Sequence, residues 1–130
     1  MRNIELDAAY DDQTQELLID SVIKSSLTDP DMYDEQHQKQ YLDFAVQHDL
    51  VFDTESDLMR AVKNDFFGLY SDVLDEMSNK YSKIFMYMHV DYSQMLTECL
   101  MNGYIDLVKQ DGKYIVYVIN PAGFYEVQYA

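Results

Sequence analysis

A hairpin signal near the C-terminus constrains the fold more than any other feature of this sequence. The Gln110-Asp111-Gly112 turn separates two runs rich in β-branched residues and tyrosine, Tyr104 to Lys109 and Lys113 to Ile119. An Asp-Gly pair suits a tight turn in which both residues have positive φ, so the two runs are predicted to pair as antiparallel strands. Pro121 cannot donate a backbone hydrogen bond and is expected to end this pairing.

Two helices are predicted in the first fifty residues. The first ends at Thr28-Asp29-Pro30 and can be capped at its start by Asp11 or Asp12. Its apolar residues at helical spacing are Leu17, Leu18, Val22 and Ile23. The second is amphipathic and spans about residues 33–48. Its stripe is Tyr33, His37, Tyr41, Phe44 and His48, widened by Leu42 and Val46.

The longest periodic stretch predicts a third helix from Glu55 to Met77. Thr54-Glu55-Ser56-Asp57 resembles a capping box, which favours a helix start there. The apolar face that follows is Leu58, Val62, Phe66, Leu69, Val73 and Met77. Gly68 lies within this stretch and costs a helix about 1 kcal/mol relative to alanine, so we expect a close backbone neighbour or a bend there.

A short helix is predicted directly before the hairpin. Asp91 can cap it, and Asn102-Gly103 can end it with a left-handed glycine. Its apolar residues are Met95, Leu96, Cys99 and Leu100. Residues 81–90 fit both a helix and a strand, with the helix preferred, because ten residues do not separate the two periodicities.

The fold class that follows is mainly α with a C-terminal β-hairpin, an α+β protein in one domain over residues 1–130. A hydrophobic fraction of 48% with 14% aromatic residues is too apolar for a disordered acidic chain. No Pro, Gly or Ser-rich linker divides the chain, and it contains no internal repeat. Within this unit, composition separates an acidic helical region, residues 1–79, from a near-neutral region, residues 80–130.

Charge is the strongest functional signal. The chain carries 24 acidic and nine basic side chains, a formal net charge of −15. Residues 1–79 hold 19 acids and five bases, a net of −14, whereas residues 80–130 hold five acids and four bases, a net of −1. Such a surface repels phosphate backbones and anionic lipids, so the expected partner is a basic protein, and direct nucleic-acid or membrane binding is not expected.

The acids are also arranged in columns along the predicted helices. Like charges at i and i+4 cost a helix about 0.2–0.5 kcal/mol per pair, so folding alone does not favour this arrangement. We therefore predict an acidic partner-binding face made of Asp12, Glu16, Asp20, Asp65, Asp72, Asp75 and Glu76. The competing interpretation is that the acidity reflects a proteome bias or keeps a tyrosine-rich chain soluble.

The C-terminal part resembles a known DNA-binding architecture. The stretch MLTECLMNGYIDLVKQDGKYIVYVINPAGFYEV is similar to the recognition helix and wing of winged helix-turn-helix domains, in particular those of RepL-like plasmid and phage replication proteins. The resemblance implies a winged-helix-like C-terminal part with DNA contacts from Lys83, Ser93, Gln94, Thr97, Lys109 and Lys113. The predicted recognition helix, however, has no Arg or Lys. Winged helices also bind proteins, a use that would suit Tyr104, Tyr114 and Tyr117.

Patterns for catalysis, metals and cofactors are incomplete. Cys99 lies in an apolar stripe and is expected to be a buried structural thiol, and His37 and His48 are three helical turns apart, too far to share a metal. The acids around Pro30 and those at residues 72–76 lack the glycine and distal glutamate of a calcium loop. No phosphate-binding or nucleophile motif is present. We therefore predict no catalytic residue, no metal, no cofactor and no enzymatic activity.

These observations rank three functions. The first is a non-enzymatic acidic protein that inhibits or regulates a nucleic-acid-binding partner by presenting a DNA-like negative surface. In size and charge the chain is similar to small phage-encoded inhibitors of restriction, CRISPR or repair enzymes. The second is a winged-helix DNA-binding regulator or replication accessory protein. The third is a virion or assembly component whose apolar faces pack against copies of itself, for example as a homodimer.

The expected location is the cytoplasm, that of the host cell if a phage encodes the chain. A single cysteine fits a reducing compartment. The sequence also has no apolar leader and no run of about 18 apolar residues.

Overall fold

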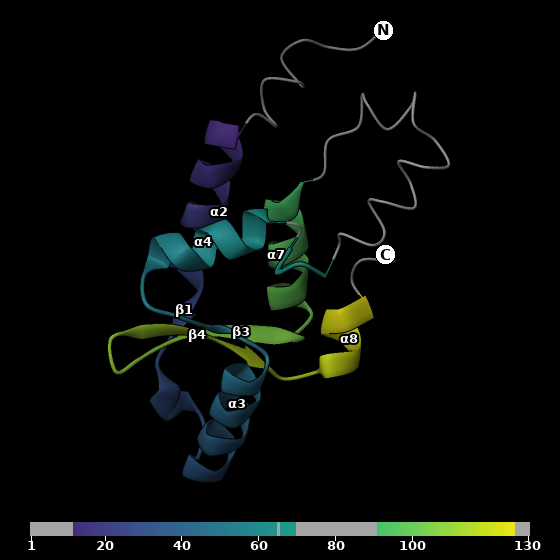
Figure 1. Ribbon diagram of the computed structural model, residues 1–130. Coiled ribbons are helices and arrows are strands. Elements are labelled where there is room, and N and C mark those ends of the chain that lie inside the picture. Colours follow the sequence, from purple (N-terminus) through teal and green to yellow (C-terminus); the bar gives the residue numbers. More distant parts are fainter. Residues whose placement is uncertain (1–11, 65, 70–90, 127–130) are drawn as a thin grey trace, which may run out of the picture.

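The computed structural model describes residues 12–64, 66–69 and 91–126, and it has a four-stranded mixed sheet at its centre (Figure 1). The strand order is β1-β3-β4-β2. The strands are β1 (Leu27–Thr28), β2 (Val51–Phe52), β3 (Ile105–Gln110) and β4 (Lys113–Val118). The helices are α2 (Asp12–Ser26), the 3-10 helix η1 (Pro30–Met32), α3 (Glu35–Gln47), α4 (Glu55–Lys63), α7 (Tyr92–Met101) and α8 (Pro121–Glu126).

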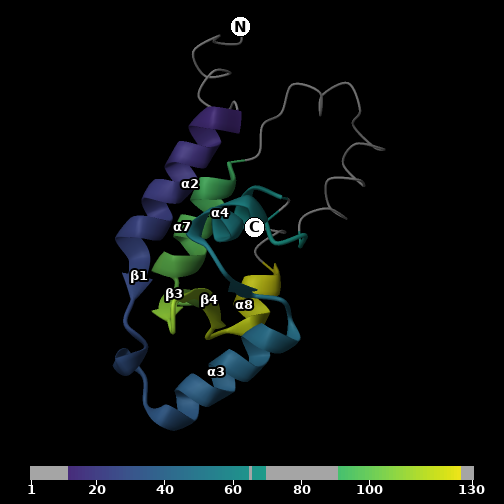
Figure 2. The ribbon, with the colours of Figure 1, turned by 60° about the vertical axis from the view of Figure 1, so that its left-hand side comes forward.

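Helices cover both faces of the sheet. Helices α2, α4 and α7 lie on one side, whereas α3 lies on the other (Figures 1 and 2). Four consecutive residues of β4, from Ile115 to Val118, are therefore buried, as expected for a strand with packed layers above and below it. Within the described residues, no helix is long and apolar enough to cross a membrane.

The α+β class and the predicted hairpin are confirmed. Strands β3 and β4 pair antiparallel, with Ile105 opposite Val118 and Gln110 opposite Lys113. Asp111 has φ 53° and Gly112 has φ 77°, the two positive angles that the turn requires.

The sheet is wider than the sequence predicted. Strand β1 pairs in parallel with β3, where Leu27 lies opposite Leu107, and β2 pairs antiparallel with β4, where Val51 lies opposite Ile115. Each edge strand has only two residues, too few to produce a recognisable alternation. The hairpin is therefore the centre of a sheet rather than a projecting wing, and the winged-helix resemblance is not confirmed.

Helix α2 is confirmed, but its buried face differs from the predicted one. Ile19 and Ile23 are fully buried, whereas Leu17 is 65% exposed and Leu18 is 44% exposed. The buried side also includes Gln15, whose Oε1 accepts a hydrogen bond from the backbone N–H of Tyr92. A polar residue that caps another helix thus occupies the inner face, and two leucines lie outside it.

Helix α4 begins as predicted but ends at Lys63, so the prediction of a helix to Met77 is wrong. Thr54 Oγ1 accepts from the Asp57 N–H at 3.0 Å, which confirms the cap. After Lys63 the chain turns, and Phe66, Phe67 and Gly68 all have positive φ. The remainder of the predicted helix, and the undecided segment 81–90, lie outside the described residues.

Packing explains this early end of α4. The Phe67 N–H donates to the Ala61 carbonyl at 2.7 Å and so closes the last turn of the helix. Phe66 is fully buried, with its ring centroid 5.9 Å from that of Phe124. Gly68 belongs to this turn and is not the helix-interior glycine that the periodicity indicated.

Helix α7 follows its sequence signals. The Asp91 carboxylate accepts from the Gln94 N–H, and Gly103, at φ 71°, ends the helix. Cys99 is fully buried, as expected, and burial together with the Glu98 carboxylate raises the pKa of its thiol to about 12. Helix α8, which begins at Pro121, was not predicted.

Candidate acidic interface

The predicted acidic column on α2 is largely neutralised by the chain's own lysines. Glu16 accepts a hydrogen bond from Lys63 Nζ of α4 at 2.8 Å, and Asp20 pairs with Lys24 at 2.8 Å. Asp12 is the first residue of the helix. The other four members of the predicted face, Asp65, Asp72, Asp75 and Glu76, lie outside the described residues. In the described part of the chain, α2 therefore does not present the free negative stripe that the spacing predicted.

A larger set of acids, none with a lysine or arginine partner among the described residues, lies on the segment that carries η1 and α3. We call it the η1–α3 acidic surface and define it as Asp29, Asp31, Asp34, Glu35, Asp43 and Asp49. All six residues are exposed. Within the described ranges, none of the six forms an ion pair with a lysine or arginine. Lys39 is the single lysine or arginine in residues 29–49, which leaves this segment with a formal charge of −5.

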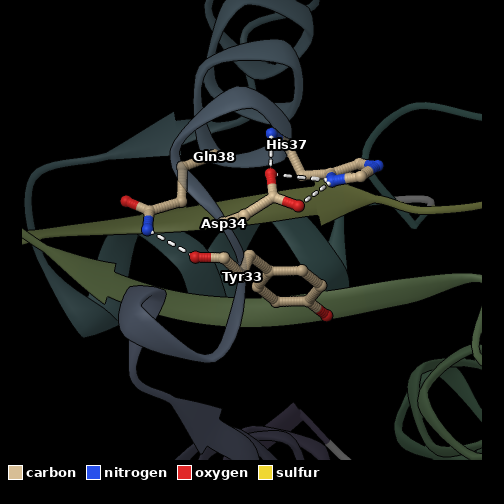
Figure 3. Close-up of polar contacts among 4 residues, drawn as sticks. All are labelled: Tyr33, Asp34, His37 and Gln38. Atoms are coloured by element: carbon tan, nitrogen blue, oxygen red, sulfur yellow. Dashed lines mark hydrogen bonds and ion pairs between the residues drawn. The ribbon is translucent and has the colours of Figure 1, made fainter.

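Two of these acids are fixed by capping the helices that carry them. Asp29 Oδ1 accepts from the Asp31 N–H at 3.0 Å at the start of η1. Asp34 accepts from both the backbone N–H and the ring Nδ1–H of His37 at the start of α3 (Figure 3). The backbone hydrogen bond from His37 is the largest of the effects that lower the pKa of the Asp34 carboxyl, so this group stays ionised.

This capping accounts for the spacing of acids around Pro30 that resembles part of a calcium loop. The carboxylates of Asp29 and Asp34 face backbone N–H groups of η1 and α3, respectively, rather than a common centre. In the portion of the chain that the structure describes, no three acidic, histidine or cysteine side chains are placed to hold a metal ion.

Side-chain hydrogen bonds to Asp106 of β3 fix the segment that runs from β1 to the start of α3. Tyr33 Oη donates to Asp106 Oδ2 of β3 at 2.7 Å, and Thr28 Oγ1 donates to Asp106 Oδ1 at 2.9 Å. Burial and the neighbouring Asp106 carboxylate raise the pKa of Tyr33. Gln38 Nε2 donates to the Tyr33 carbonyl, which fixes the entry to α3 (Figure 3). The acidic surface therefore has a defined shape.

The hairpin tyrosines are mainly packing residues. Tyr117 was predicted to contact a partner, but it is fully buried, with its ring centroid 5.5 Å from that of Tyr33 and 5.4 Å from that of Tyr41. Helix α3 covers the face of the sheet on which this side chain lies. Tyr104 and Tyr114 are half-buried.

Two of the three α7 residues that the winged-helix resemblance assigned to DNA, Ser93 and Thr97, are not exposed. Ser93 is only 8% exposed and donates its hydroxyl to the Asp91 carboxylate, so its assignment to a groove-reading face is wrong. The Thr97 hydroxyl donates to the Ser93 carbonyl. Of Ser93, Gln94 and Thr97, only Gln94 is exposed.

The hairpin lysines are also engaged. Lys113 Nζ pairs with Asp53 at 2.5 Å, and Lys109 Nζ lies 5.4 Å from the ring centroid of Tyr114. Lys83 lies outside the described residues. Of the two described lysines, Lys113 is therefore paired with an acid and Lys109 lies over a tyrosine ring.

The charge spacing placed the predicted acidic face on other helices, and the acids around Pro30 were considered only as calcium ligands, so the η1–α3 acidic surface was missed. The signal was present in a simpler form, since residues 29–49 contain six acids and one lysine. Two of these acids, Asp29 and Asp34, are cap residues, whose positions are set by helix starts rather than by the repeat along a helix.

Comparison with protein-family models, with curated proteins and with solved structures found no match.

Proposed function

We propose that this protein is a non-enzymatic acidic interaction protein that binds the basic, nucleic-acid-binding surface of a partner and excludes nucleic acid from it. The observation that carries the proposal is the η1–α3 acidic surface, whose six exposed carboxylates have no lysine or arginine partner among the described residues. In contrast, Glu16, Asp20, Asp53 and Asp57 elsewhere in the chain are paired.

Unpaired exposed acids act on a cationic partner at long range. Opposite potentials accelerate encounter and fix orientation, and the effect weakens as salt screens it over about 8–10 Å. A lysine- or arginine-rich groove that normally binds phosphates meets a similar field at this surface. The low pKa of Asp34 keeps that part of the charge in place in mildly acidic solution.

The winged-helix alternative has less support from the described residues. It needs Ser93 on the surface and Lys109 and Lys113 free for phosphates, whereas Ser93 is buried and Lys113 is paired with Asp53. If the chain acts as a DNA-binding regulator, it shifts duplex DNA in a gel, and Lys109→Glu/Lys113→Glu abolishes that shift. No shift at low salt on any duplex tested rejects this alternative.

The acidic proposal is tested with two variants that remove the same charge from different places. Glu35→Gln/Asp43→Asn neutralises two exposed acids of α3, and Glu98→Gln/Asp111→Asn neutralises two acids outside the η1–α3 acidic surface. Wild type and both variants are immobilised and exposed to lysate from the source organism at low salt. Bound proteins are eluted with a salt gradient or with duplex DNA and identified by mass spectrometry.

The expected result is capture of basic nucleic-acid-binding proteins that duplex DNA displaces. The α3 variant should release them at lower salt than wild type, whereas the control variant should behave like wild type. Retention that does not change with ionic strength, or duplex DNA that fails to displace the captured proteins, contradicts the proposal. Equal loss in both variants shows that bulk charge, not this surface, causes the binding.

A further inference from the structure

A cavity of about 310 Å³ lies between the turn after α3, strand β2 and the end of α4. Its lining consists of His48, Asp49, Leu50, Phe52, Ala61, Asn64, Phe67 and Gly68. These residues come from the turn after α3, from β2, and from the end of α4 with the turn that follows it. The volume is at the lower end of the range for ligand sites, about 300–1,000 Å³, so the cavity suits one side-chain-sized group better than a nucleotide.

Two aromatic rings form fixed walls of this cavity. The ring centroids of Phe52 and Phe67 are 6.3 Å apart, with an interplanar angle of 41°. Phe67 is held by further ring contacts, at 5.0 Å from Phe66 and 5.8 Å from Phe124. The faces of such rings are electron-rich and attract cations.

The polar side chains of the lining are His48, whose ring stacks on Phe44, and two groups with unused hydrogen-bonding capacity, the Asp49 carboxylate and the Asn64 amide. Asp49 lies at the end of α3 with φ 58°, and the Leu50 N–H behind it donates to the Ala45 carbonyl at 2.8 Å. In the described part of the chain, neither the Asp49 carboxylate nor the Asn64 side-chain amide has a hydrogen-bond partner. No lysine or arginine lines the cavity. An anionic ligand is therefore disfavoured, and a cationic donor is favoured.

We propose that this cavity binds the guanidinium group of an arginine side chain presented by a basic partner. The Asp49 carboxylate accepts two of its N–H groups, the Asn64 amide oxygen accepts a third, and the flat face of the group lies against Phe52 or Phe67. Guanidinium fits this combination better than ammonium, because it is planar, more weakly hydrated and bidentate toward carboxylates. The source of the arginine rests on the proposed function, whereas the chemistry of the cavity is testable without a partner.

The test is a titration of the full chain with N-acetyl-L-arginine amide, followed by the backbone amide signals in ¹H–¹⁵N NMR spectra. N-acetyl-L-citrulline amide is the matched ligand, since it has nearly the same shape and no charge. Asp49→Asn removes the carboxylate and retains a residue type that tolerates positive φ. Asp111→Asn is the matched variant, because Asp111 is also exposed, has φ 53° and loses the same charge.

We expect saturable shifts at residues 48–52 and 66–68 with the arginine probe and at least several-fold weaker binding of the citrulline probe. Asp49→Asn should weaken arginine binding about fivefold, the scale of losing the charge of one exposed ion pair while an oxygen acceptor remains, and Asp111→Asn should leave it unchanged. Absent or non-saturable shifts, equal binding of the two probes, or equal loss in the two variants overturns the inference. If basic partners are captured but the cavity binds no arginine, the proposed function stands and this inference fails. If the cavity binds arginine but no basic partner is captured, the proposed function fails and the cavity remains an arginine site.

Discussion

Replacing Gly123 by alanine tests how tightly α8 packs on the start of β3. In most helices this change stabilises by about 1 kcal/mol, because alanine loses less backbone entropy. Here, a Cβ on residue 123 would lie 2.8 Å from Cγ and 2.6 Å from Cε1 of the Tyr104 ring. Rotating the ring about its own axis does not move Cγ, so relief requires a change in χ1 or a shift of the helix.

The backbone of Tyr104 cannot shift easily to make room. Its carbonyl accepts hydrogen bonds from the N–H groups of Ile119 and Asn120, at 2.9 and 3.0 Å. Overpacking of this kind costs about 1–3 kcal/mol, so after subtracting the helix gain we expect Gly123→Ala to destabilise the fold by up to about 2 kcal/mol. For a chain of 130 residues this is a fall in Tm of up to about 7 °C.

The assay is thermal unfolding followed by circular dichroism, carried out as a double-mutant cycle. In a Tyr104→Ala background the obstacle is absent, and Gly123→Ala should become stabilising. Ala122→Gly, at an exposed position of the same helix, measures the local helix propensity separately. A rise in Tm for Gly123→Ala in the otherwise wild-type chain refutes the reasoning, as does the absence of coupling between positions 104 and 123.

Three other results are expected. Tyr33→Phe removes the donor to Asp106 and should lower the free energy of unfolding in urea by about 1.5 kcal/mol. Tyr41→Phe loses no hydrogen bond within the described residues and should lower it less. Equal losses would contradict a stabilising role for the bond between Tyr33 and Asp106. The pKa of Asp34 is lowered in the fold, so its contribution to stability is present above the ordinary carboxyl pKa and is lost as pH falls through the folded value. The difference between wild type and Asp34→Asn in acid-dependent unfolding should therefore close below about pH 4, and a gap that widens there would refute the assignment. Cys99 is buried with a thiol pKa near 12, so a thiol-reactive disulfide reagent should label it only as fast as the chain unfolds, and rapid labelling in native buffer would contradict its position.

The sequence was most informative where local chemistry decides the structure. The Asp111-Gly112 turn, the Thr54 and Asp91 caps and the Gly103 helix end depend on a few neighbouring residues, and each is confirmed. Helix existence was also predictable, since α2 and α3 both occur where the periodicity placed them.

The sequence was less informative where distant parts of the chain meet. The side of α2 that is buried depends on α4 and α7, and the end of α4 depends on the contact between Phe66 and Phe124. The two-residue strands β1 and β2 exist because the hairpin supplies their partners. Hydrophobic periodicity is read over windows of about 10 to 18 residues, so it does not reveal contacts between residues that are farther apart in the sequence.

The candidate site was only partly predictable for the same reason. Net charge and its concentration before residue 80 were correct from the composition alone. Which acids stay unpaired depended on ion pairs such as that between Glu16 and Lys63, 47 positions apart. The cavity beside Asp49 is assembled by three separate turns and strands and has no sequence signature.

The strand order has a consequence for how the chain matures. The two edge strands of the sheet, β1 and β2, are translated early. The two central strands, β3 and β4, come from the last quarter of the sequence. Leu27 must wait for Leu107, 80 positions later, before their parallel ladder can form. Loop closure on this scale slows two-state folding toward the millisecond-to-second range. A nascent chain stalled before residue 105 therefore contains both edge strands but neither central strand, and a chaperone would bind it in that state.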